Sequence, residues 1–396
     1  MADGARNRRL RGLFLRGSSV CLGTLVALFL AEGATRLLAP RILSLSNPLV
    51  RFDPELGWLQ QDGVLATRRN EAGEAVTLEG LPMGIRKPPR PHPSAEADTV
   101  LVVGDSVTAG NQVPYPRTWP AEAERLLRFH RPRAQVVNAG VDGYDLAQEF
   151  RLGDRLWGRF RPRVLVVGLY VGNDLVDYER EAQARPPWAP GGLAVWVTEH
   201  SYLYHFLRGS DFLSEQRTTT RRLPRAQVPF PEWDPRALPG LSDLTPEQQG
   251  RIRGQFASPE LLPVLRGGEP AARRLETSER VLLAFAGLAA ERCAGFVLVL
   301  LPTKQQVLPA QREAWQRLHG LSRDQVERPQ RELRQWASRQ GVAVVDATEA
   351  LSRSERPEAL FWPVDLHLSP AGHAAVAQAV APAIDAAWKS PADCGR

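Results

Sequence analysis

Five short apolar runs, rich in valine and leucine, recur along the chain after residue 95. They lie at residues 99–103, 135–138, 164–169, 295–301 and 342–345. Runs of this length without regular polar alternation are typical of parallel strands that are covered on both faces.

Apolar residues at helical spacing fill the stretches between these runs, at residues 118–127, 146–160 and 275–288, and Pro370 begins a last helix that continues to about residue 388. Strands that alternate with helices in this way predict an α/β fold. We therefore expect a three-layer, doubly wound parallel sheet of about five strands.

Two stretches depart from this alternation. Residues 41–95 are rich in proline, glycine and charge, and they predict an irregular lead-in on the domain surface. Residues 182–268 carry many prolines, arginines and aromatics. That stretch is too long for a plain loop and predicts an insertion or cap within a domain of residues 96–390. Its aromatic side chains fit either a small core of their own or a ligand surface beside the sheet.

The amino terminus is first basic and then apolar. Five arginines stand against one aspartate before residue 18, and an apolar segment follows at residues 17–39. This order is typical of a signal peptide or a signal anchor, and a membrane crossing needs about 20 residues. Because Ala31-Glu32-Gly33 is a poor cleavage site, we expect residues 1–40 to be a tail and an uncleaved transmembrane helix. Cleavage would instead give a secreted protein.

The charge pattern also predicts orientation. The positive-inside rule places residues 1–16 in the cytoplasm and the rest of the chain on the periplasmic or extracellular side of the inner membrane. The net charge of +6 is mostly local to this tail, and no stripe of arginines interleaved with aromatics follows it. Nucleic-acid binding is therefore not expected, and the oligomeric state stays open.

Polar clusters follow four of the predicted elements, at residues 104–106, 138–144, 172–174 and 365–373. The carboxyl ends of parallel strands meet at one edge of a sheet, which is where such folds bind ligands. We therefore expect these four clusters to converge.

The converging residue types are those that acyl transfer requires. Ser106 can act as the nucleophile, His367 as its base, and Asp365 as the group that orients the base. The backbone amides of Ser106 and Gly140 and the side chain of Asn173 can serve as an oxyanion hole.

Other polar residues nearby have simpler interpretations. His373 is a second candidate base, for which we expect a structural role. Asp142 and Asp174 could share a metal ion, but paired carboxylates more often cap helices or brace loops, and no metal is expected. Gln148 and Glu149 are expected on a helix face or a pocket rim.

Two further site classes lack their signatures. The glycine-rich stretch 104–110 has neither a P-loop lysine nor a Gly-x-Gly-x-x-Gly pattern, which argues against phosphate binding. The three cysteines, at 21, 293 and 394, form no Cys-x-x-Cys or Cys/His cluster, which argues against structural zinc. Whether Cys293 and Cys394 pair stays open.

Together, the motifs resemble those of the SGNH/GDSL hydrolase family. The first block of that family, Gly-Asp-Ser-x-Thr-x-Gly, is matched by Gly104, Asp105, Ser106, Thr108 and Gly110. Its second block contributes a glycine, matched by Gly140. Its third block, Gly-x-Asn-Asp or a close variant, stands here without the spacer as Gly172, Asn173 and Asp174.

The last family block carries the catalytic Asp and His, commonly with two residues between them. One residue separates Asp365 from His367, which is similar to the membrane-anchored bacterial branch and to relatives of alginate O-acetyltransferases. The resemblance implies a flavodoxin-like fold, an esterase or acyltransferase activity and no cofactor. It also implies that Gly104, Asp105, Thr108, Gly110, Gly172 and Asp174 support the turns around the site.

Three functions follow as hypotheses. The first is a membrane-anchored serine esterase that hydrolyses an acyl ester of a small molecule or a glycan. The second is an O-acyltransferase or deacetylase acting on a cell-surface polysaccharide. The third is a non-catalytic glycan-binding envelope protein, against which the intact Ser106, His367 and Asn173 argue.

Overall fold

The computed structural model describes two units, which we take in turn. The first comprises residues 1–52 and 187–228, and the second residues 53–186 and 229–396. The described residues are 2–38, 50–53, 55–60, 65–81, 85–86, 98–175, 201, 203, 245, 248–249, 252, 256 and 261–388.

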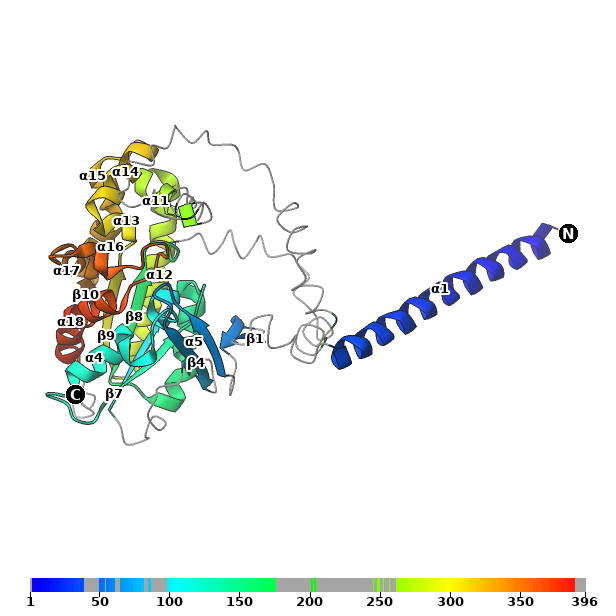
Figure 1. Ribbon diagram of the computed structural model, residues 1–396, viewed down its shortest axis with the longest axis horizontal. Coiled ribbons are helices and arrows are strands. Elements are labelled where there is room, and N and C mark those ends of the chain that lie inside the picture. Colours follow the sequence, from blue (N-terminus) through cyan, green and yellow to red (C-terminus); the bar gives the residue numbers. More distant parts are fainter. Residues whose placement is uncertain are drawn as a thin grey trace. The chain divides into compact units, whose positions relative to one another are not determined.

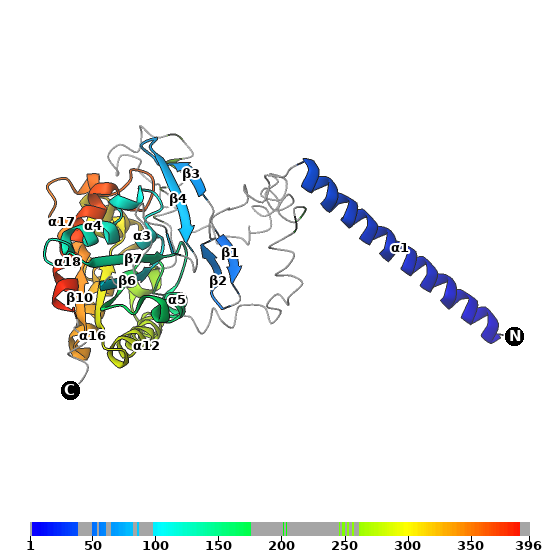
Figure 2. The same ribbon diagram turned by 90° about the horizontal axis from the view of Figure 1, so that it is seen from below.

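The first unit contains α1 (Ala2–Leu38), a single unbroken helix (Figure 2). Its segment Gly17–Leu38 has 22 residues and is, among the described residues, the one helix long and apolar enough to cross a membrane. At 1.5 Å per residue it measures about 33 Å, which matches the roughly 30 Å hydrocarbon core of a bilayer. Apolar side chains along it, such as Phe29 and Leu37, are exposed.

The second unit is built on a five-stranded sheet of order β10-β9-β8-β6-β7, in which every neighbouring pair is parallel. This confirms the predicted α/β fold with a parallel five-stranded sheet. The strands are β6 (Asp98–Gly104), β7 (Ala134–Gly140), β8 (Val164–Tyr170), β9 (Gly295–Leu301) and β10 (Ala343–Asp346).

Helices cover both faces of this sheet and complete three layers (Figure 1). An apolar cluster lies on each face of the sheet. In strand β6, Leu101 and Val103 pack into one of these clusters, and Val100 and Val102 pack into the other. One face is covered by α5 (Leu146–Phe160), α11 (Leu262–Arg266), α12 (Glu269–Glu291) and α16 (Arg328–Gln340). The other is covered by α4 (Trp119–Leu127), α17 (Ala347–Ser352) and α18 (Pro370–Ala386).

Short helices connect these layers. They are α3 (Ser106–Ala109), η1 (Tyr115–Arg117), α13 (Lys304–Val307), α14 (Pro309–His319), α15 (Arg323–Val326) and η4 (Pro357–Leu360).

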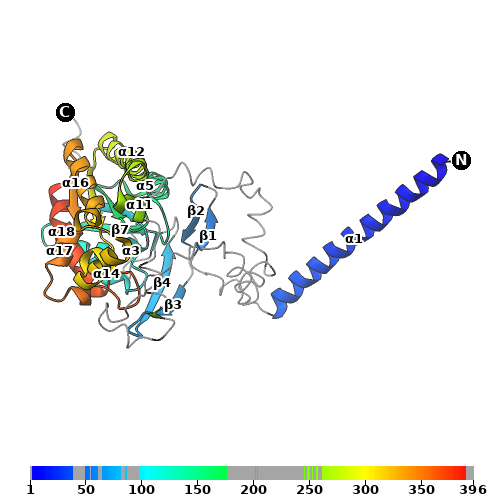
Figure 3. The ribbon, with the colours of Figure 1, turned by 90° about the horizontal axis from the view of Figure 1, so that it is seen from above.

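The lead-in at residues 41–95 is not irregular, contrary to our expectation. It contains β1 (Val50–Asp53), β2 (Gly57–Gln60), β3 (Leu65–Arg69), β4 (Ala75–Leu81) and β5 (Ile85–Arg86), and the last three form an antiparallel sheet with the β3–β4 hairpin shown in Figure 3. In β4, the buried Val76 and Leu78 alternate with the less buried Ala75, Thr77 and Glu79, a period-two pattern typical of a half-buried strand. The lead-in is also not confined to the surface, because Leu59 and Ile85 join the main core.

Most of the predicted insertion at residues 182–268 lies outside the described residues. Its last part contains α11, whose Val264 and Leu265 are fully buried in the main core. Cys394 also lies outside the described residues, so the pairing of Cys293 and Cys394 stays open.

Candidate active site

The predicted nucleophile stands at the first turn of a short helix that directly follows the central strand β6. Asp105 caps α3 by accepting a hydrogen bond from the N–H of Val107 at 2.9 Å. Gly110 ends the helix in the left-handed region, with φ of 61°. Aspartate before a helix and glycine after it are the preferred caps, so the Gly-Asp-Ser-x-Thr-x-Gly pattern folds locally into a strand, a cap and one helical turn.

Two glycines let this turn sit close against the sheet. A Cβ on Gly104 would lie 2.2 Å from Oγ1 of Thr108, and one on Gly140 would lie 2.3 Å from the backbone nitrogen of Ala109. Both positions therefore require glycine for packing, and together they fix the height of Ser106 above the sheet.

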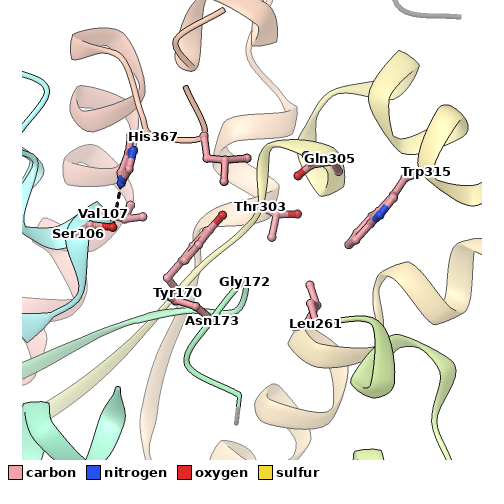
Figure 4. A pocket seen from close by; sticks show the side chains of 11 residues that line it. Ser106, Val107, Tyr170, Gly172, Asn173, Leu261, Thr303, Gln305, Trp315 and His367 are labelled. Carbon is pink, nitrogen blue, oxygen red and sulfur yellow. Dashed lines mark hydrogen bonds between the residues drawn. The ribbon is translucent and has the colours of Figure 1, made fainter. Parts of the chain in front are cut away.

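His367 and Asp365 reach Ser106 from the loop between η4 and α18. The Nε2 atom of His367 lies 2.8 Å from Oγ of Ser106, drawn as the dashed line in Figure 4. The other ring nitrogen, Nδ1, is hydrogen-bonded to Oδ1 of Asp365. That carboxylate places the ring proton on Nδ1, which leaves Nε2 as an acceptor for the Ser106 hydroxyl. The same Oδ1 also accepts the backbone N–H of His367 at 3.0 Å.

The electrostatic surroundings favour the charged form of this histidine. Burial lowers the pKa of His367, but the hydrogen bond and the charge of Asp365, with smaller contributions from Asp105 and Asp142, outweigh burial and raise it above its usual value. A raised pKa makes the imidazole a better proton acceptor, as a general base requires.

Asn173 reaches the site from the turn after β8, the strand next to β6. The backbone N–H groups of Asn173 and Asp174 both donate to the carbonyl of Tyr170, which forms the turn. The Asn173 side chain lines the cavity beside Ser106 and hydrogen-bonds to Asp105. The amide has two N–H groups, so one bond to Asp105 leaves a second donor for a substrate oxygen.

Gly140 does not fit the predicted role of an oxyanion donor. Its N–H donates to Oδ1 of Asn138 at 3.0 Å, so the donor is already used within its own strand. Two of the predicted oxyanion donors stay candidates. One is the backbone N–H of Ser106, which stands at a helix end where N–H groups have no intrahelical partner, and the other is the side chain of Asn173. Gly140 contributes space for α3 instead.

Asp105, Glu149 and Asp174 form a group of three buried carboxyl side chains that interact with one another. Burial raises the pKa of Asp105 to about 6, and burial together with the mutual repulsion of the group raises the pKa of Glu149 and Asp174 well above their usual values. Gln148 and Glu149 lie on the helix α5, as expected, but both are buried and neither lines the cavity, so they do not form a pocket rim. Asp174 accepts the backbone N–H of Tyr170 at 2.6 Å and thus braces its own turn.

His373 has the structural role that we expected. Its Nδ1 accepts the backbone N–H of Trp119 at 3.2 Å, and burial lowers its pKa to about 3. The ring is therefore neutral and is fixed at the start of α18. Among the described residues, no group of three histidine, cysteine or acidic side chains is arranged to hold a metal ion.

A cavity of about 180 Å³ opens beside Ser106 and His367 (Figure 4). Tyr170 and Thr303 line its middle, and Leu261 and Trp315 line the end away from Ser106.

A comparison with known families decides the assignment. The sequence profile of the GDSL-like lipase/acylhydrolase family matches residues 102–375, more than half of the chain. The chain belongs to this family. It is therefore a GDSL-like hydrolase that acts on ester bonds.

Solved structures that are similar to this chain include a G-D-S-L family protein and two esterases. A lipolytic protein of the G-D-S-L family from Desulfitobacterium hafniense is 12% identical, with 72% of this chain and 99% of that chain covered and a TM-score of 0.37. A catalytic mutant of the acetylxylan esterase Axe2 from Geobacillus stearothermophilus is 16% identical, with 74% and 96% covered and a TM-score of 0.36. The esterase EstA from Pseudoalteromonas is 10% identical, with 73% and 97% covered and a TM-score of 0.34. No curated protein matches the chain.

One part of this GDSL-like hydrolase's site was not predicted from the sequence. Thr303 and Gln305 follow β9 and line the cavity. Their segment is a polar cluster directly after a predicted strand, which is the same signal that identified the other four.

Proposed function

We propose that this GDSL-like hydrolase is a serine esterase, anchored in the inner membrane, that cleaves acyl esters through an acyl-enzyme. The observation that carries the proposal is the continuous set of hydrogen bonds from Ser106 Oγ through the His367 ring to Asp365. It joins a nucleophile, a base and an orienting carboxylate, which is the arrangement that acyl transfer uses.

The first half of the reaction transfers the acyl group to the enzyme. Ser106 Oγ attacks the ester carbonyl carbon while its proton passes to Nε2 of His367. The Ser106 N–H and the Asn173 amide stabilise the negative charge that develops on the carbonyl oxygen. His367 then gives its proton to the leaving alcohol oxygen as the carbon–oxygen bond breaks.

The second half releases the acid. Water gives a proton to His367 and attacks the acyl carbon, and the proton returns to Ser106 Oγ when the carboxylic acid leaves. Asp365 stays ionised throughout and holds the imidazolium that forms twice in the cycle.

The test of this chemistry uses the full chain in detergent. We expect turnover of short p-nitrophenyl esters and covalent labelling by a fluorophosphonate, with both lost in Ser106→Ala. Turnover that survives in Ser106→Ala, or an intact chain that neither turns over nor takes the label, would contradict the proposal.

The membrane location rests on the apolar segment of α1 and on the five arginines in the first part of that helix. In the apolar segment, Thr24 and Thr35 donate to carbonyls one turn earlier, and Arg36 pairs with Glu32 at 2.8 Å. Such pairing within the helix reduces the cost of polar groups in lipid. We expect the protein in the inner-membrane fraction, with its catalytic domain digested by protease added to spheroplasts. Recovery in the soluble periplasm would support a cleaved signal instead.

A second candidate function is O-acyl transfer to, or deacetylation of, a cell-surface polysaccharide. It is favoured by Gln305, which lines the cavity and whose buried Nε2 has no hydrogen-bond partner among the described residues. A hydroxyl-bearing substrate such as a sugar would satisfy that donor. Comparing the acetate content of surface polysaccharide between wild type and a deletion strain tests this function, and equal content contradicts it.

A further inference from the structure

The tip of the β3–β4 hairpin is a rigid turn. Oδ1 of Asn70 accepts the backbone N–H groups of Ala72 at 3.1 Å and Glu74 at 3.0 Å. Gly73 lies in the left-handed region, with φ of 77°, and its N–H donates to the carbonyl of Asn70. The turn therefore presents Glu71 in a defined direction.

Glu71 binds the loop that carries Asp365 and His367. One oxygen of its carboxylate accepts the backbone N–H of Val364 at 3.0 Å, and the other accepts the backbone N–H of Asp365. Hydrogen bonds to a charged acceptor are about twice as strong as neutral ones. This exposed side chain thus holds two consecutive peptide groups next to the proposed base.

Lys304 holds the carbonyl groups of the two preceding residues of the same loop. Its Nζ donates to the carbonyl of Trp362 at 2.6 Å and to that of Pro363 at 2.7 Å. The side chain is buried, and burial lowers its pKa to about 8, while the charges of Glu71 and Asp365 oppose that shift. A cation and an anion therefore fix residues 362–365 in sequence.

The sheet of β3, β4 and β5 also contacts the segment that carries Ser106. Arg86 in β5 is 1% exposed and donates to the carbonyls of Ala109 at 3.0 Å, Gly110 at 2.7 Å and Val113 at 2.7 Å. Ala109 is the last residue of α3, the helix that Ser106 begins. Residues of the lead-in thus contact both the nucleophile turn and the histidine loop.

We propose that Glu71 and Lys304 are positioning residues that set the distance between His367 and Ser106, with Arg86 holding the opposite side. The inference rests on the proposed function, since it assigns these residues to that reaction. Glu71 and Arg86 lie before residue 102, where the family match begins. The alignment of the base is therefore supplied in part by a segment that lies outside the family match.

The test measures kcat and KM separately for Glu71→Ala and Glu71→Gln in the full chain. We expect kcat of Glu71→Ala to fall about tenfold or more with KM nearly unchanged, because a shift of about 1 Å in a catalytic group can cost up to 100-fold. Glu71→Gln keeps one oxygen acceptor and should lie between wild type and Glu71→Ala. Glu74→Gln is the matched control on the same exposed turn, and it should keep wild-type kcat.

The pH profile provides a readout that a purely structural role would not change. The charged groups that act on His367 are Asp365, Asp105 and Asp142, and Lys304 in turn interacts with Glu71 and Asp365. Glu71→Ala frees the backbone N–H of Asp365, and the Asp365 carboxylate is the main group that raises the pKa of His367, so the acid limb of kcat/KM should move to lower pH. Lys304→Met frees the carbonyls of Trp362 and Pro363 in the same loop and should move it in the same direction.

Three results separate this inference from the proposed function. Wild-type kcat in Glu71→Ala, with Ser106→Ala inactive, overturns the positioning role alone. Loss of activity in proportion to a lower melting temperature, with the acid limb unmoved, overturns it as well. An active Ser106→Ala overturns the proposed function itself.

Discussion

Substituting alanine at Gly140 tests whether this glycine acts through space rather than through its N–H. The new methyl carbon would lie 2.3 Å from the nitrogen of Ala109 and 2.8 Å from the carbonyl carbon of Thr108. Both neighbours are backbone, so no side-chain rotation relieves the overlap. Non-bonded carbon contacts are favourable at about 3.5–4 Å, and α3 must therefore retreat from β7 by about 1 Å.

The retreat carries Ser106 with it, because Thr108 and Ala109 belong to the same one-turn helix. The distance from Ser106 Oγ to His367 Nε2 is 2.8 Å, and a further 1 Å would take it beyond hydrogen-bond range. We expect kcat/KM to fall about 100-fold, equivalent to about 2.7 kcal/mol of transition-state stabilisation.

The assay compares kcat/KM for a p-nitrophenyl ester, the rate of fluorophosphonate labelling and the melting temperature. Gly158→Ala is the control, because Gly158 lies exposed in α5 with nothing within 4 Å of its added methyl. It should keep full activity and gain about 0.5–1 kcal/mol of stability. Activity of Gly140→Ala within threefold of wild type would refute the packing argument, since alanine keeps the N–H that an oxyanion donor needs.

Three further outcomes follow from the site. Asn173→Ala should lower kcat/KM by about 10²–10³-fold, because one oxyanion donor contributes about 2.7–4 kcal/mol; initial rates over a range of ester concentrations check this. The pKa of His367 is raised above its usual 6.5 and the base must be neutral, so the acid limb of kcat/KM should lie above pH 6.5, and Asp365→Asn should move it lower. Glu149→Gln concerns stability. The pKa of Glu149 is higher in the folded protein than in the unfolded chain. The stability associated with its neutral form is therefore fully present at pH below the unfolded-state pKa and is lost as the pH rises through the folded-state pKa. The melting temperature of Glu149→Gln relative to wild type should therefore increase as the pH rises above the ordinary value of 4.5, and a constant difference would contradict this.

The pattern of apolar residues was enough to predict the sheet, because parallel strands buried on both faces leave an unmistakable signature. Each predicted strand, such as 164–169, falls within a few residues of an observed one. The polar cluster after each strand was equally informative, since topology brings the carboxyl ends of β6 and β8 side by side. The local pattern of apolar runs and polar clusters was therefore enough to predict both the fold and the proximity of Ser106 and Asn173.

Contacts between segments far apart in sequence could not be predicted in this way. Glu71 meets Asp365 across nearly 300 residues, and Arg86 meets Gly110 from a strand of two residues. Neither residue stands in a motif, and a charged side chain in a short strand resembles an ordinary solvated position. The use of the Gly140 N–H by Asn138 is likewise a matter of side-chain geometry that composition does not encode.

The single residue between Asp365 and His367 has a consequence for how the proposed base is oriented. Because Oδ1 of Asp365 accepts both the backbone N–H and the ring nitrogen of His367, the tripeptide closes on itself as an Asx-type turn. Three consecutive residues, 365–367, therefore determine the tautomer and the tilt of the imidazole. Inserting one residue between Asp365 and His367 should change the orientation of the imidazole ring without affecting the sheet.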